Sequence, residues 1–125
     1  MPIQIASPIL GKPVVTPSKT DLVVMLYDGI GRMLGEAEVA LVGQQMDVLH
    51  NRLVRAQACI AELTAGLDME KGGEIARNLM DIYDYWNRRL VEANVKKDAT
   101  PVREVRGHVL DLKEVWEQIA AQAAN

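Results

Sequence analysis

The chain contains 125 residues, of which 49% are hydrophobic and 25% are charged. This length and composition predict one soluble globular domain and exclude a disordered chain. Fourteen Lys and Arg residues against seventeen Asp and Glu residues give a net charge of −3, so no nucleic-acid partner is expected, because a duplex-binding surface needs clustered positive charge. The single cysteine excludes an internal disulfide and suits the reducing cytoplasm, where we expect the protein to be located.

Residues 1–15 are expected to form an extended N-terminal arm. Pro2, Pro8 and Pro13 restrict the backbone there, and no stretch of the chain approaches the ~20 apolar residues that cross a membrane, so no membrane insertion is expected. The arm is apolar, and leaving its aliphatic side chains in water is costly. We therefore expect it to dock as a lid over a binding groove, as permanent core, or as an element exchanged between two copies. The candidate lid residues are Ile5, Ile9 and Leu10.

Two helices follow the arm and begin a bundle domain that spans residues 16–125. Thr16-Pro17 predicts the first helix start, with Ser18 and Asp21 as a competing capping box. Apolar residues then recur at alternating spacings of three and four, which places them on one face of a helix. The two predicted core faces are Val23, Leu26, Ile30, Met33, Ala37 and Ala40, and Leu49, Leu53, Ala56, Ile60, Leu63 and Leu67.

Two further helices complete the chain. The segment 68–73 is expected to be a turn, because its paired glycines disfavour a helix. A second cap-then-proline pair, Thr100-Pro101, predicts the start of the last helix. The predicted core faces are Ile75, Leu79, Ile82, Trp86 and Ala93, and Val102, Val105, Val109, Leu112, Trp116, Ile119 and Ala123.

Short connections between four helices make sequential helices antiparallel neighbours. The sustained spacing of three and four is the seam pattern of helices that pack nearly parallel, at about 20°. The sequence therefore predicts an all-α protein, an antiparallel up-down-up-down four-helix bundle with an extended N-terminal arm.

Residues for catalysis or metal binding are scarce in this sequence. A di-iron bundle needs Glu-x-x-His pairs, and neither His50 nor His108 has a glutamate three residues before it. Cys59 lies in a helical, apolar context with no base assigned to it, which is typical of a packed residue. We therefore expect no enzyme, no catalytic residue, no cofactor and no metal.

Apolar and small residues outside the predicted core faces are the informative ones. They favour a shallow groove that binds an amphipathic or disordered peptide, although close packing between helices explains any one of them equally well. The candidate groove residues are Tyr27, Gly31, Leu34, Val54, Ala58, Ala61, Ala65, Ala76, Met80, Tyr83 and Asn87.

Several segments resemble the FliS family of bacterial flagellar export chaperones. The most specific is the run Gly-Leu-Asp-Met-Glu-Lys-Gly-Gly-Glu-Ile-Ala over residues 66–76, with Tyr83-Asp84-Tyr85 after it. Leu-Tyr-Asp-Gly over residues 26–29 and Val-Trp-Glu-Gln-Ile over residues 115–119 extend the likeness to most of the chain.

The resemblance implies a cytosolic four-helix bundle that binds the disordered C-terminal segment of flagellin. Such binding prevents premature polymerisation and keeps flagellin competent for type III flagellar export. The resemblance also implies contacts with a flagellar export-gate protein and, in some lineages, with assembly regulators. Family members often carry a tyrosine in the N-terminal segment, whereas this chain has none before Tyr27.

Two alternatives stay open. The first is a chaperone or adaptor of the same fold with another secreted or regulatory client. The second is a structural homodimer with exchanged arms, so the sequence leaves both a monomer and a homodimer possible.

Overall fold

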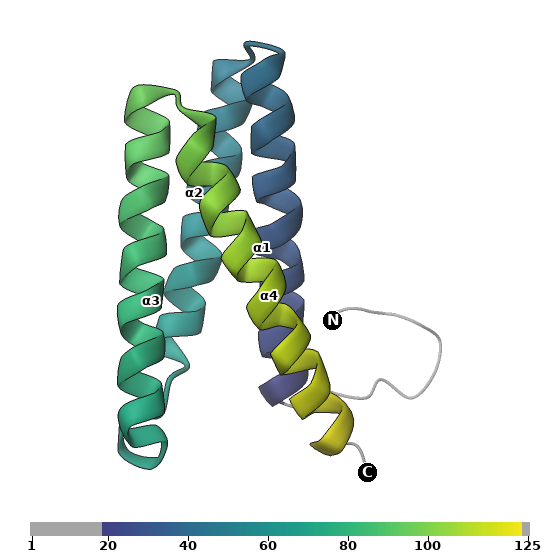
Figure 1. Cartoon of the computed structure of the whole chain (residues 1–125), viewed down its shortest axis with the longest axis vertical. Coiled ribbons are helices and arrows are strands. Elements are labelled where there is room, and N and C mark those ends of the chain that lie inside the picture. Colours follow the sequence, from purple (N-terminus) through teal and green to yellow (C-terminus); the bar gives the residue numbers. More distant parts are fainter. Residues whose placement is uncertain (1–18, 124–125) are drawn as a thin grey trace.

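Four helices account for residues 19–123, the part of the chain that the computed structural model describes. They are α1 (Lys19–Val42), α2 (Met46–Ala65), α3 (Met69–Lys96) and α4 (Ala99–Ala123). Successive helices run in opposite directions, and α4 crosses the front of the bundle at a slant (Figure 1). The prediction of an all-α, antiparallel four-helix bundle is confirmed. Within the described residues, no helix is long and apolar enough to cross a membrane.

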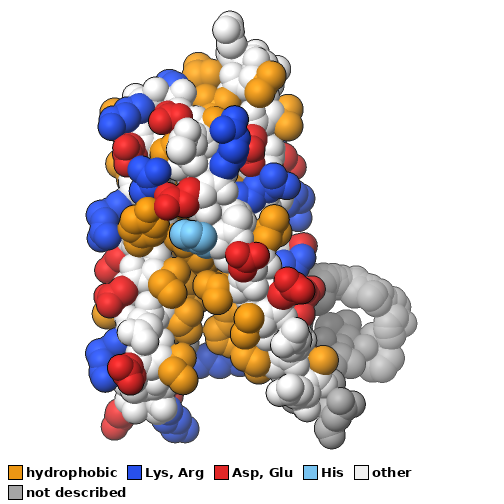
Figure 2. All heavy atoms as spheres, in the orientation of Figure 1, with side chains coloured by type: hydrophobic (Ala, Val, Ile, Leu, Met, Phe, Trp, Pro, Cys, Tyr) orange, Lys and Arg blue, Asp and Glu red, His pale blue; other side chains and the backbone are white. Residues whose placement is uncertain are grey.

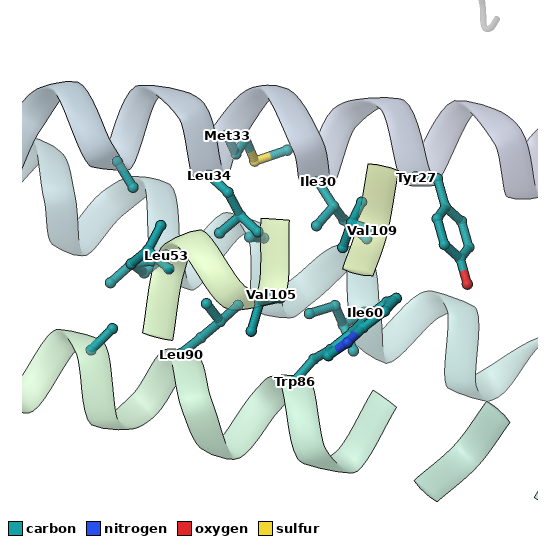
Figure 3. Packing of buried hydrophobic residues seen from close by; sticks show 14 of the residues in the cluster. Tyr27, Ile30, Met33, Leu34, Leu53, Ile60, Trp86, Leu90, Val105 and Val109 are labelled. Carbon is teal, nitrogen blue, oxygen red and sulfur yellow. The ribbon is translucent and has the colours of Figure 1, made fainter. Parts of the chain in front are cut away.

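The core is aliphatic along most of its length and receives side chains from every helix. Figure 3 shows Leu34 of α1, Leu53 of α2, Leu90 of α3 and Val105 of α4 converging on one another. All four side chains are fully buried. Burying a side chain of this size contributes roughly 1.5–3 kcal/mol, so the repeated apolar faces account for the association of the helices.

The segment 68–73 is helical rather than the simple turn predicted from its glycines, so that prediction is wrong in its detail. The Asp68 carboxylate accepts hydrogen bonds from the backbone N–H groups of Glu70 and Lys71, at 3.2 and 2.9 Å, and so caps the start of α3. One turn later Gly73 interrupts the helix with φ +50° and ψ −125°. Residues with side chains disfavour this conformation, whereas glycine adopts it readily. The paired glycines therefore interrupt α3 but do not prevent the helix from forming.

The start of α4 also differs from the prediction, because Thr100 is not its cap. The Asp98 side chain accepts the backbone N–H of Thr100 at 3.0 Å, and the helix already begins at Ala99. Pro101 lies in the first turn, where backbone N–H groups have no partner within the helix. The N–H group that proline lacks therefore costs no helical hydrogen bond. The expected caps at Thr16 and Ser18 lie outside the described residues.

Glycines inside α1 have different surroundings. A Cβ atom at Gly31 would lie 3.4 Å from Cδ2 of Leu110, so this glycine faces α4 at van der Waals distance. A Cβ atom at Gly29 would meet only the flexible end of Met33, at 3.7 Å. Gly31 therefore faces a neighbouring helix and Gly29 faces only a residue of its own helix, and neither contact is too short for a Cβ atom.

We predict opposite effects on stability from the same substitution at two glycines. Gly29→Ala should raise the free energy of unfolding by about 0.5–1 kcal/mol, because alanine favours a helix and there is room for its methyl group. Gly73→Ala should lower it by about 1–2 kcal/mol, because the backbone there has positive φ. Urea unfolding followed by circular dichroism measures both, and equal shifts for the two variants would contradict this account.

Candidate functional site

The bundle is closed at one end and open at the other. In α4, Val102, Val105 and Val109 are buried, whereas no residue from 110 to 122 is. In α1, likewise, burial begins only at Tyr27. Figure 1 shows the reason, because the lower half of α4 stays beside α1 and diverges from α3.

Polar contacts hold α4 to its two neighbours over different lengths. On the α1 side, Lys113 donates to the Asp28 carboxylate at 2.9 Å, well along the C-terminal half of α4. On the α3 side, Glu104 accepts from the Tyr85 hydroxyl at 2.7 Å and from Arg89 Nε at 2.6 Å. These hydrogen bonds hold the pKa of the Glu104 carboxyl below its usual range.

A further hydrogen bond joins α3 to α4, because the Trp86 indole donates to Nδ1 of His108 at 3.3 Å. Among residues 19–123 no hydrogen bond or ion pair joins α3 to α4 beyond His108. Beyond His108, the polar contact of α4 within the described residues is with α1, through Lys113 and Asp28.

An apolar groove lies where the helices diverge. It has a volume of about 540 Å³ and receives residues from all four helices and from the α2–α3 connection. Figure 2 shows hydrophobic side chains gathered between the lower halves of α3 and α4, where the surface is hollowed. The apolar groove is lined by Lys19, Thr20, Leu22, Val23, Leu26, Glu62, Leu63, Gly66, Leu67, Asp68, Gly72, Ile75, Ala76, Leu79, Tyr83 and Trp116.

Several hydrophobic side chains at this end are exposed to water. Ile75, in the groove, is 72% exposed, and Val115 and Ile119 on α4 are 48% and 41% exposed. Each would contribute up to roughly 1.5–3 kcal/mol if another molecule covered it fully. The groove is thus suited to an apolar helix face, with charged residues such as Lys19 and Glu62 among those that line it.

Four aromatic residues pack together beside the apolar groove, and two of them, Tyr83 and Trp116, line it. The Tyr27 and Tyr83 hydroxyls are 2.7 Å apart, and the Tyr83 and Trp86 ring centroids are 5.3 Å apart. Trp116 lies 6.3 Å from the Tyr27 ring, centroid to centroid. Burial raises the pKa of both tyrosines above the usual range, so both hydroxyls keep their protons near neutral pH.

The predicted groove residues fall into three groups. Tyr27, Gly31 and Leu34 are buried inside the bundle, which corrects their assignment to surplus surface. Ala76 and Tyr83 are buried too, yet both line the apolar groove. The remaining candidates lie outside the core and outside the groove lining: Val54, Ala58, Ala61 and Ala65 on α2, and Met80 and Asn87 on α3.

Asn87 has a structural contact of its own. Its side-chain oxygen accepts a hydrogen bond from Nε2 of Gln57 at 2.9 Å, which joins α3 to α2. A second bridge between these helices joins Asn94 to His50, also at 2.9 Å. The predicted lid residues Ile5, Ile9 and Leu10 lie outside the described residues.

Seven of the sixteen residues that line the groove were predicted as core. The predicted core faces continue into the open end, so these seven residues line the groove, and all of them except the buried Leu63 are partly or fully exposed: Val23, Leu26, Leu63, Leu67, Ile75, Leu79 and Trp116. One feature of the sequence could have indicated the groove. Residues 22–27 are six consecutive apolar residues, and they cover every side of a helix. Such a helix needs partners on more than one side. Among residues 19–123, no group of three His, Cys, Asp or Glu could hold a metal ion.

Comparison with known proteins connects this geometry to one family. Residues 6–123 match the family described as flagellar protein FliS. The chain is 40% identical over 112 residues to the flagellar secretion chaperone FliS of Salmonella typhimurium, covering 89% of this chain and 83% of the relative. It is 34% identical over 103 residues to the flagellar secretion chaperone FliS of Bacillus subtilis, covering 82% and 76%. It is also 34% identical over 99 residues to the flagellar secretion chaperone FliSB of Pseudomonas aeruginosa, covering 79% of each chain.

The Glu104 contacts predict a defined pH dependence of stability. Because the pKa of Glu104 is lower in the folded state, its contribution is present above the unfolded pKa and is lost as pH falls through the folded pKa. Glu104→Gln should therefore cost about 1 kcal/mol at pH 7, and this cost should fall as the pH drops through the folded-state pKa of Glu104. Urea unfolding across this range measures the difference, with Glu114→Gln at an exposed position of α4 as the control. A Glu104→Gln cost that is independent of pH would contradict the assignment.

Proposed function

Because the chain belongs to the FliS family, whose named relatives are flagellar secretion chaperones, we propose that it binds the disordered C-terminal segment of flagellin in the cytoplasm. The segment binds as an amphipathic helix in the apolar groove. Binding of this segment in the groove prevents flagellin from polymerising prematurely and keeps it competent for type III flagellar export.

The observation that carries this proposal is an apolar groove that the bundle leaves open at one end. A disordered segment loses conformational freedom when it becomes a helix, and that ordering costs about 2–5 kcal/mol or more. Covering exposed side chains such as Ile75 and Leu22 offsets the cost. The groove requires only an apolar face of suitable width, which fits a client that is unfolded before it binds.

The N-terminal arm and other partners belong to the same proposal. Ile5, Ile9 and Leu10 compete with the client for the apolar groove, and the client-loaded protein contacts a flagellar export-gate protein and assembly regulators. The alternatives make different predictions. A different secreted client would co-purify from the native cytoplasm in place of flagellin. An arm-exchanged homodimer would become a monomer in light scattering once residues 1–15 are removed.

We predict that a charge in the groove weakens client binding and that a matched charge elsewhere does not. Ile75 and Val95 are both on α3 and similarly exposed, at 72% and 76%, but they lie 20 residues apart, roughly 30 Å along a helix. Ile75→Glu should lower affinity for a flagellin C-terminal peptide at least about tenfold, because the peptide would bury the carboxylate against an apolar face. Val95→Glu should leave affinity unchanged.

Isothermal titration calorimetry measures both affinities, and thermal unfolding confirms that both variants fold. Ala61→Arg, on the exposed face of α2, reports whether the client also covers that helix. Equal affinities of Ile75→Glu, Val95→Glu and the unmodified protein would place the client outside the groove. No saturable heat with the unmodified protein would contradict flagellin as the client.

A further inference from the structure

Charged residues are divided unevenly between the two ends of the bundle. The half of each helix at the open end, with the α2–α3 connection, comprises residues 19–30, 56–82 and 111–123 and is called the open half (Figure 1). The closed half comprises residues 31–55 and 83–110. The open half contains four Lys or Arg residues and ten Asp or Glu residues, whereas the closed half contains nine and seven. Their net charges are therefore −6 and +2.

The acidic excess of the open half is largely unpaired. In the closed half, four of the seven acidic residues form ion pairs, for example Glu104 with Arg89 at 2.6 Å. In the open half, Asp28 pairs with Lys113 at 2.9 Å. Apart from Asp28 and Asp21, the acidic residues of the open half have no ion pair within residues 19–123. The like charges of the open half therefore repel one another, and a basic partner would relieve this repulsion.

The apolar groove lies within this acidic half. All the residues that line it belong to the open half except Tyr83. The charged lining residues are Lys19, Glu62 and Asp68, of which two are acidic. The Asp68 carboxylate accepts backbone hydrogen bonds at the start of α3, whereas Glu62 is exposed and has no hydrogen bond or ion pair within residues 19–123. The Glu62 carboxylate is therefore available to a cation on a ligand.

Two further carboxylates border the groove, one on α3 and one on α4. Glu74 precedes Ile75, and Glu117 follows Trp116, and both of these neighbours line the groove. Glu74 and Glu117 are exposed, and neither has a hydrogen bond or ion pair within the described helices. Because apolar walls strengthen the field of charges at the edge of a cleft, acidic residues on α2, α3 and α4 favour a positively charged ligand.

Lysine and arginine suit both parts of this surface, because their aliphatic stems pack on apolar side chains while their charged groups reach the carboxylates beyond. We propose that the apolar groove selects a client helix whose apolar face is bordered by lysine or arginine, and that these residues pair with the carboxylates around the groove. A helix bordered by aspartate or glutamate would be repelled by the same carboxylates. The inference rests on the proposed function, because it specifies the chemistry of the helix that the apolar groove binds.

A double-mutant cycle tests the inference. The probe is the C-terminal segment of flagellin from the same bacterium, with each lysine and arginine replaced in turn by glutamine. The full-length protein is compared with the triple variant Glu62→Gln/Glu74→Gln/Glu117→Gln and with two matched single variants on α2, Glu62→Gln and Asp47→Asn. Asp47 lies in the closed half and, like Glu62, is exposed and without an ion pair within residues 19–123. Calorimetry measures affinity, and thermal unfolding of each unbound variant shows that it folds.

At least one lysine or arginine of the segment should be coupled to the groove. Its replacement should weaken binding to the unmodified protein and to Asp47→Asn about two- to fivefold, the effect of one exposed ion pair. The same replacement should have no effect on binding to the triple variant. Glu62→Gln should weaken binding of the unreplaced segment, whereas Asp47→Asn should not. In 1 M salt, where the screening length falls from about 8 Å to about 3 Å, these losses should disappear.

Other outcomes separate the inference from the proposed function. If the unmodified protein binds the segment and no lysine or arginine couples to the three carboxylates, the inference is overturned and the proposed function stands. Losses that persist unchanged in 1 M salt would overturn the inference in the same way. If the unmodified protein does not bind the segment at all, the proposed function is overturned and the inference falls with it.

Discussion

The structure depends on one constraint, which is that α4 cannot follow α1 and α3 along its whole length. Its C-terminal half stays beside α1, where Gly31 faces Leu110 and Lys113 pairs with Asp28. Its hydrogen bonds with α3, within the described residues, are made by Glu104 and His108. The bundle therefore closes around an aliphatic core at one end and parts at the other. The apolar groove is the uncovered continuation of the same helix faces.

This constraint also explains why an aromatic cluster lies at the boundary between the two halves. Trp86 and Tyr83 come from α3, Tyr27 from α1 and Trp116 from α4. Large rings span a distance that valine and alanine, which fill much of the closed end, cannot span. The cluster seals the core from the groove while presenting Tyr83 and Trp116 to it.

The sequence predicted the fold well, because a bundle is specified by apolar periodicity, and the faces of Ile30 to Ala40 and Leu49 to Leu63 are buried as expected. It predicted the groove poorly. Periodicity reports which residues share a face, and it does not report where two helices separate. Ile75 therefore counted as core although it is exposed, and Leu34 counted as surface although it is buried. The predicted start of α4 was wrong for a related reason, since Asp98 and Thr100 both suit a cap and only the backbone path decides between them.

Methyl NMR of the labelled protein during titration with the flagellin C-terminal segment tests the central claim most directly. The account predicts that methyl signals from the open end, such as Leu79 and Val115, shift on binding, whereas those of Leu49 and Leu53 in the closed core do not. Val54, on the outer face of α2, reports the competing surface. Shifts at Val54 without shifts at Leu79 would show that the client binds elsewhere and that the open end of the bundle is not its site.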